Sequence, residues 1–200
     1  MGDIDLYKGC DPGEIWDRRH TSDAGGVNSV SLGGKTRGDV WETLRYALDG
    51  EGIAERLRGE KVVELGSGKY PFFRNYCVDC GVKEFMGVDL FEPPLFDGVE
   101  RMSDSSVEYF QEDCLRFLQK QPSGNAIIAQ IMLFCRENIM GSVTVRPNEI
   151  IRAICLEVYR VVAPGKFLIS WNAGLPFRQG LVQAGFVESD SEVIYSKPVL

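Results

Sequence analysis

One short stretch of the sequence decides the fold, and it reads Val62-Val63-Glu64-Leu65-Gly66-Ser67-Gly68-Lys69-Tyr70-Pro71. An apolar run that ends in two glycines spaced by one residue is typical of a strand that enters a tight turn. Because glycine has no Cβ, the backbone of such a turn can approach a ligand closely. The stretch therefore predicts a strand over 61–65 and a ligand-binding turn directly after it.

The composition limits the class of protein. The chain has 200 residues, of which 44% are apolar and 26% charged, as in a soluble globular protein with one domain. The formal net charge is -7 and there is no Lys/Arg-rich run, so nucleic acid is not expected as a partner. No apolar stretch approaches the roughly 18 residues of a membrane span. The N-terminus lacks the charged-then-apolar pattern of a secretion signal, and we expect a cytoplasmic protein.

Six cysteines and one histidine, His20, are the candidate metal ligands. Without a secretion signal, the cysteines are expected as reduced thiols. Cys77-Val78-Asp79-Cys80 has the spacing of some zinc and redox motifs, but a structural zinc ion needs two more ligands and the other cysteines are scattered singly. On a helix the two thiols share one face, where cysteine packs as a small apolar residue. No metal is expected.

Strand-like and helix-like patterns alternate along most of the chain. Residues 1–38 are irregular and glycine-rich, which predicts a flexible segment or lid in front of a domain over 39–200. Asp39, with Glu42 three residues later, indicates the N-cap of a first helix. Further strands are expected over 84–90, 107–111, 126–133, 166–171, 186–188 and 193–196, and further helices over 71–80, 114–120, 147–162 and 176–184. The alternation predicts a three-layer α/β/α sandwich with a mostly parallel sheet and a C-terminal antiparallel hairpin.

Three classes of ligand compete for the glycine turn. A nucleoside-triphosphate loop needs four residues between its first glycine and a Gly-Lys-Ser/Thr, and that spacing is absent. A dinucleotide fingerprint needs a third glycine at position 71, where Pro71 stands. S-adenosylmethionine carries no phosphate and needs a glycine turn with an acid for its ribose hydroxyls. Asp89 at the end of the second expected strand suits the ribose. Asp113 after the third can reach the adenine amino group, although a role as the N-cap of the helix expected over 114–120 explains it equally well.

These residues carry a family resemblance. Val63-Glu64-Leu65-Gly66-Ser67-Gly68, Gly87-Val88-Asp89 and Glu112-Asp113-Cys114 resemble the successive cofactor motifs of class I S-adenosylmethionine-dependent methyltransferases. The stretch 157–166 resembles the helix and Pro-Gly turn before that family's fifth strand, and Ala184-Gly185-Phe186 its turn into the terminal hairpin. The resemblance covers roughly residues 61 to 196. It implies a Rossmann-like sheet of order 3-2-1-4-5-7-6 and transfer of a methyl group from S-adenosyl-L-methionine.

The resemblance also implies roles for single residues. The cofactor-binding candidates are Glu64, Gly66, Ser67, Gly68, Asp89, Leu90, Asp113, Cys114 and Gln130. The candidates on the acceptor side are Trp16, Arg19, Phe134, Trp171 and Asn172. His20 is the candidate general base because its ordinary pKa lies near neutrality, although a solvated surface histidine explains it as well. The acceptor is expected to be a small molecule or a protein side chain, since the acidic balance disfavours nucleic acid.

Two departures from the family pattern keep other functions open. Tyr70 stands where many members have a third glycine, and the stretch 129–134 has neither an acid nor an Asn-Pro pair. The second departure argues against methylation of adenine or glutamine amino groups. Both leave room for a catalytically inactive domain that serves as a binding or scaffold subunit. A nicotinamide-dependent oxidoreductase is a third interpretation, which requires Pro71 to be tolerated in place of glycine. The sequence leaves the oligomeric state open.

Overall fold

A computed structural model describes residues 37–67, 72–90, 106–131, 147–171 and 173–199 of the chain. Its strands are β1 (Lys61–Leu65), β2 (Glu84–Asp89), β3 (Ser106–Gln111), β4 (Ile127–Ile131), β5 (Phe167–Trp171), β6 (Val187–Glu188) and β7 (Ile194–Ser196). Its helices are α3 (Arg37–Gly50), α4 (Ile53–Leu57), α5 (Phe72–Asp79), α6 (Cys114–Lys120), α8 (Pro147–Val161) and α9 (Leu175–Ala184). None of these described helices is long and apolar enough to span a bilayer.

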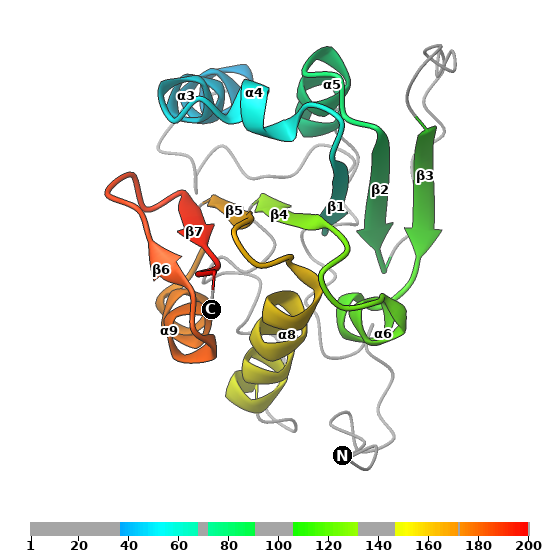
Figure 1. The fold of residues 1–200 in the computed structure, drawn as a ribbon, viewed down its shortest axis with the longest axis vertical. Coiled ribbons are helices and arrows are strands. Elements are labelled where there is room, and N and C mark those ends of the chain that lie inside the picture. The colour runs from blue at the N-terminus through cyan, green and yellow to red at the C-terminus, as the bar shows by residue number, and fades with distance from the viewer. Residues whose placement is uncertain (1–36, 68–71, 91–105, 132–146, 172, 200) are drawn as a thin grey trace.

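The strands form one seven-stranded sheet with the order β3-β2-β1-β4-β5-β7-β6 (Figure 1). Strands β1 to β5 run parallel to one another, whereas β7 is antiparallel to both β5 and β6. The central strand β1 pairs on both sides, with Val63 opposite Met86 of β2 and Ile128 of β4. The predicted strand order, the parallel core of the sheet and the C-terminal hairpin are all confirmed.

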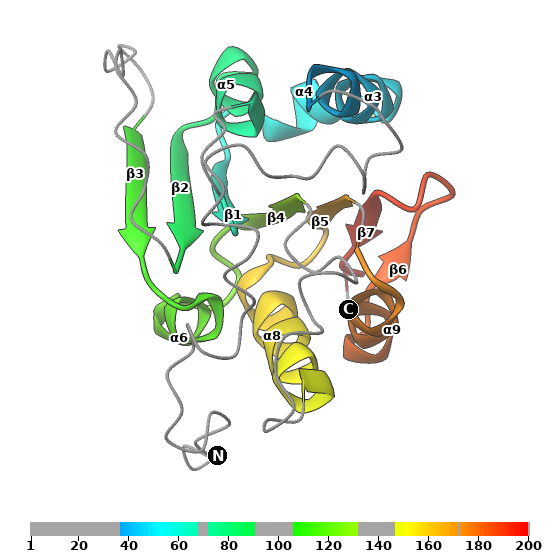
Figure 2. The ribbon, with the colours of Figure 1, turned by 180° about the vertical axis from the view of Figure 1, so that it is seen from behind.

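Helices cover both faces of the sheet. Figures 1 and 2 show α3, α4 and α5 on one face and α6, α8 and α9 on the other. Neighbouring residues of β1 point to opposite faces, so Val62 packs into the core beneath the first group of helices and Val63 into the core beneath the second. This burial on both sides explains why the central strands read as nearly continuous apolar runs.

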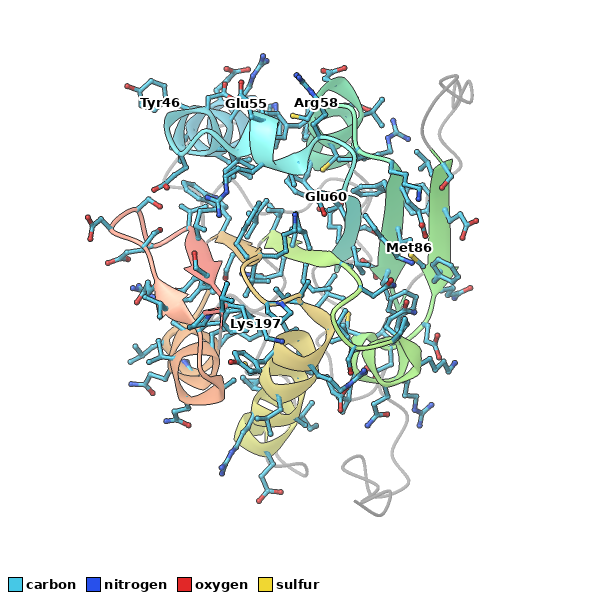
Figure 3. All side chains as sticks on the ribbon, viewed as in Figure 1. Tyr46, Glu55, Arg58, Glu60, Met86 and Lys197 are labelled. Atoms are coloured by element: carbon cyan, nitrogen blue, oxygen red, sulfur yellow. The ribbon has the colours of Figure 1, made fainter. Side chains whose placement is uncertain are left out.

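The long helix α8 buries one apolar side and is capped by a lysine from the end of the chain. The buried side consists of Ile150, Ile151, Ile154, Val158 and Val161. Lys197, labelled in Figure 3, donates from Nζ to the carbonyl oxygens of Tyr159 at 2.6 Å and Val162 at 2.7 Å. Tyr159 lies in the last turn of α8 and Val162 directly follows the helix, so the lysine donates where the carbonyls at a helix end need donors from outside it.

Arg160 ties α8 to α6. Its Nη1 donates to the carbonyl oxygen of Gln121 at 2.7 Å, and its Nη2 donates to that of Leu118 at 2.7 Å. Both acceptors lie at the C-terminal end of α6, where a cation is also favoured by the helix dipole. The contact fixes the position of α6, whose other end lies at the carboxyl edge of the sheet.

One expectation about the helices was wrong, and one helix was not expected. The first helix begins at Arg37, so Asp39 lies inside its first turn and is not the N-cap. Helix α4 was not expected, because it is only five residues long and follows Gly52, which has a φ of 62°. Its two buried residues, Ile53 and Leu57, are one helical turn apart, so packing against the sheet stabilises a helix too short to form alone.

Candidate functional site

The turn after β1 lies against the end of β2. Gly66 has a φ of 69°, a left-handed conformation that side chains rarely adopt. The N–H groups of Gly66 and Ser67 both donate to the carbonyl oxygen of Val88, at 2.7 Å and 3.2 Å. The turn is thereby fixed at the carboxyl edge of the sheet, where ligands of open α/β sheets bind.

Asp89 and Cys114 lie beside this turn. Asp89 ends β2 and is half-buried, and its carbonyl oxygen accepts from the N–H of Glu112 at 2.8 Å. The thiol of Cys114, the first residue of α6, lies close enough to the Gly66 N–H for that group to affect its pKa. Burial raises the pKa of this thiol, as do the carboxylates of Asp113 and Asp89, whereas the Gly66 N–H lowers it. Residues from three separate predicted motifs therefore meet at one edge of the sheet.

Asp113 is the N-cap of α6, as the sequence predicts. Its Oδ1 accepts from the backbone N–H of Arg116 at 3.0 Å, and the residue is only 4% exposed. The cap satisfies one of the N–H groups that the first turn of a helix leaves without a partner. This contact explains an acid at position 113 by itself, and a role toward adenine stays a prediction.

Glu64 is a buried acid at the same edge of the sheet. It lies on β1, is 4% exposed, and shares the sheet face covered by α5. Burial raises the pKa of Glu64 well above its ordinary value, the nearby Asp89 raises it further, and Arg74 of α5 lowers it. The charge of Glu64 at neutral pH thus depends on the balance between burial and a single described cation.

Solved structures share the architecture of this seven-stranded sheet. A candidate sarcosine dimethylglycine methyltransferase from Galdieria sulphuraria superposes with a TM-score of 0.50 at 15% identity, covering 92% of this chain and 72% of that chain. The chain has the fold of the class I S-adenosylmethionine-dependent methyltransferases.

Two further solved structures are similar to this methyltransferase fold. An S-adenosylmethionine-dependent methyltransferase from Mesorhizobium loti is 13% identical, with a TM-score of 0.49 and coverage of 70% of this chain and 80% of that chain. A complex of the Haloferax volcanii Trm112 methyltransferase activator with a candidate methyltransferase is 16% identical, with a TM-score of 0.49 and coverage of 75% and 70%. No protein-family model and no curated protein sequence matches the chain.

Two other predicted site residues, Gln130 and Trp171, contact each other at the ends of β4 and β5. The fully buried Gln130 donates from Nε2 to Ser170 Oγ at 2.6 Å and to the carbonyl oxygen of Trp171 at 3.3 Å. The half-buried Trp171 packs against the core on the α3 side of the sheet. Both side chains therefore have a structural explanation within the sheet, and their roles toward cofactor and acceptor stay predictions.

Several predicted site residues lie outside the described residues. They are the cofactor candidate Gly68, the candidate base His20 and the acceptor-side candidates Trp16, Arg19, Phe134 and Asn172. Tyr70 and Pro71, on which the comparison of ligand classes depends, also lie outside them. Leu90 is described and half-buried, and its carbonyl oxygen accepts from Gln111 Nε2 at 3.5 Å.

Sequence reasoning missed two polar residues of this site, Arg74 and Tyr109. Arg74 lies on α5 and Tyr109 on β3, and their side chains form a hydrogen bond. The signal that could have found them is Gly87, because a glycine inside a strand often marks a close approach. A Cβ at Gly87 would lie 2.5 Å and 2.6 Å from Cδ1 and Cε1 of Tyr109, so the tyrosine ring occupies the space that a side chain would need.

The cysteines of the Cys-x-x-Cys motif are buried thiols. Cys77 lies on α5 and Cys80 follows that helix, and burial raises the pKa of both. Within the described ranges, no group of three or more His, Cys, Asp or Glu residues is placed to hold a metal ion. The burial of both thiols agrees with the interpretation that they pack as small apolar residues.

Proposed function

We propose that this protein is an S-adenosylmethionine-dependent methyltransferase that acts on a small molecule or a protein side chain. The observation that supports the proposal best is the convergence of Gly66, Asp89 and Cys114 at the carboxyl edge of the sheet. These residues come from three motifs that are far apart in the sequence. A fold can persist without its chemistry, so the proposal rests on this site and not on the sheet alone.

The residues present fit the cofactor. The left-handed Gly66 leaves its turn without a side chain at the point of closest approach, and the half-buried Asp89 offers carboxylate oxygens that can accept from both ribose hydroxyls. Glu64 would receive the ammonium group of the amino-acid tail, while Asp113 and Cys114 would border the adenine. When bound, the sulfonium supplies a methyl group that is already activated for transfer.

The protein's part in such a reaction is mainly to hold the acceptor in line with the methyl group. Correct orientation of two reactants can supply much of the reduction of a barrier, so a catalytic triad is not required. A general base is needed only where the acceptor is a hydroxyl or a protonated amine, and His20 is the candidate for that task. Trp171 at the end of β5 would form one wall of the acceptor site.

A second candidate function is that of a binding or scaffold subunit without catalytic activity. Leu175 and Val182 of α9 are 63% and 50% exposed, and Val187 of the edge strand β6 is 59% exposed. Figures 1 and 2 show α9 and β6 side by side at the same end of the sheet. Exposed apolar side chains gathered on adjoining elements are a feature of interaction surfaces, and they favour this alternative specifically.

Transfer of a labelled methyl group separates the two functions. The purified protein is incubated with methyl-tritiated S-adenosylmethionine and a cell extract divided into small-molecule, protein and nucleic-acid fractions. We expect label in the small-molecule or the protein fraction, lost with Asp89→Ala and kept with Asp79→Ala, which removes an exposed acid at the end of α5. Label in nucleic acid would contradict the proposed acceptor class. Binding of the cofactor without transfer to any fraction would favour the scaffold function.

A further inference from the structure

Three neighbouring strands place Glu64, Gly87 and Tyr109 in one row across the sheet. Gly87 of β2 is the direct partner of Glu64 on β1 and of Tyr109 on β3. Because a Cβ at Gly87 would come within 2.6 Å of two ring carbons of Tyr109, the ring lies over the glycine and reaches toward β1. The missing side chain in the middle of the row thus brings the phenol near the buried carboxylate.

Arg74 of α5 interacts with two members of this row. Its guanidinium forms a hydrogen bond with Tyr109 and interacts electrostatically with Glu64. Its Nε and Nη2 donate to Oδ1 of the adjacent Asn75 at 3.1 Å and 2.8 Å, and its Nη1 atom is buried. A guanidinium keeps its charge at any physiological pH, so these contacts hold a permanent cation beside Glu64.

The ionisable groups around Glu64 differ in their effect on its charge. The described groups that face it are Asp89 of β2, Arg74 and Cys77 of α5, and Tyr109 of β3. Asp89 opposes ionisation, and the thiol and the phenol are neutral near pH 7 because burial raises the pKa of both. Among the residues that the structure describes around Glu64, Arg74 is the cation that favours its carboxylate form. A carboxyl group with so little exposure takes up a proton unless a cation offsets its loss of water.

We propose that Arg74 is a positioning residue that favours the carboxylate form of the buried Glu64, so that Glu64 can receive the ammonium group of an amino-acid ligand. The role of Tyr109 is to hold the guanidinium in place across Gly87. The ligand part of this proposal rests on the proposed function, in which the amino-acid tail of S-adenosylmethionine is that ligand. A protonated Glu64 could offer such a tail only a neutral hydrogen bond, which is weaker than a charge-assisted one.

Carbon NMR on the ligand-free protein tests the effect of Arg74 on Glu64 directly. The protein is labelled with 13C-glutamate at the side-chain carboxyl, and the Glu64 signal is assigned by its loss in Glu64→Gln. Arg74→Gln should move the titration midpoint of that signal upward by about one pH unit or more. Arg74→Lys keeps a cation, so its titration midpoint should lie close to that of the wild type. This comparison can be made even if Arg74→Gln folds poorly. Arg58→Gln, at an exposed site labelled in Figure 3, should leave the midpoint unchanged. A midpoint that stays the same in Arg74→Gln would overturn the inference, whatever the protein binds.

Ligand affinity then tests the second step. The Kd of S-adenosylhomocysteine is measured by calorimetry between pH 5.5 and 8.5 for the wild type, Arg74→Gln, Arg74→Lys and Arg58→Gln. We expect Arg74→Gln to weaken binding about tenfold at neutral pH and to shift the loss of affinity on acidification to a higher pH. If Arg74→Gln binds as tightly as the wild type and with the same pH profile, the inference about Arg74 is overturned, while the proposed function is not affected. No binding by the folded wild type would overturn the proposed function, whichever way the NMR midpoint moves.

Discussion

Replacement of Gly87 by alanine probes the close approach that organises the site. The backbone at Gly87 allows any residue, because its φ is not among the positive values found in this part of the chain. The added Cβ would nevertheless lie 2.5 Å and 2.6 Å from two carbons of the Tyr109 ring and 3.0 Å from Ser67 Oγ. Carbon atoms pack at about 3.5 to 4.0 Å, so the ring has to move by about 1 Å.

The expected cost follows from this overlap. Overpacking of a protein interior typically costs about 1–3 kcal/mol, and we expect about 2 kcal/mol for Gly87→Ala, because the half-buried Tyr109 has some room to move. In the background of Tyr109→Ala only the contact with Ser67 Oγ at 3.0 Å remains, and a small rotation of the serine side chain relieves it. The same substitution should then be neutral or stabilising by about 0.5 kcal/mol through the reduced freedom of the unfolded chain. The coupling energy between the two positions should therefore be about 2 kcal/mol.

Urea denaturation followed by circular dichroism measures these free energies of unfolding for the two single variants and the double variant. Gly50→Ala is the matched control, since a Cβ there meets nothing within 4 Å at the end of α3, and it should be neutral or slightly stabilising. If Gly87→Ala costs the same with and without the Tyr109 ring, the ring does not occupy the space over Gly87. Tyr109 could then not reach across Gly87 to hold the guanidinium of Arg74.

Three further variants test the electrostatics and the caps around the site. Folding raises the pKa of Glu64 above its ordinary 4.5, so its contribution to the unfolding free energy falls as the pH rises above about 4.5. The unfolding free energy of Glu64→Gln minus that of the wild type should therefore grow with pH in urea titrations from pH 4 to 8, and a flat difference would contradict the shift. Asp113→Ala should lose about 0.5–2 kcal/mol of stability while Asp113→Ser retains most of it, because serine also caps a helix; equal losses in urea melts would exclude the cap. Arg160→Gln should cost about 2 kcal/mol through its two carbonyl contacts, whereas the exposed Arg152→Gln on the same helix should change stability by less than about 0.5 kcal/mol. Similar thermal and urea midpoints for these two arginine variants would refute the link between α8 and α6.

Much of the fold follows from periodicity and turn residues. The apolar run before Gly66 predicted both ends of β1 correctly, because a strand that is buried on both faces and followed by a glycine turn has clear ends. The strand order came from the family resemblance and not from the pattern of single elements. Helix α4 was not predictable, since its stability comes from the burial of Ile53 and Leu57 and not from its own sequence.

The candidate site was predicted only where a residue type and a strand end coincide. Asp89 was proposed in this way, and its place at the end of β2 is as expected, while the cap by Asp113 followed from the helix pattern after it. The neighbours of Glu64 were missed because Arg74 and Tyr109 reach it from a different helix and a different strand, across the register of the sheet. Such contacts depend on which strands pair and at which residues, which a local pattern does not contain.

Calorimetric titration with S-adenosylmethionine and S-adenosylhomocysteine shows whether the carboxyl edge of the sheet binds the cofactor. We predict that the wild type binds both with a Kd on the order of micromolar, that Asp89→Ala weakens binding at least about tenfold, and that Asp79→Ala binds like the wild type. Circular dichroism of each variant shows whether the fold is kept. Absence of binding by the folded wild type, or equal binding by Asp89→Ala, would contradict the claim that the carboxyl edge of this sheet is a cofactor site.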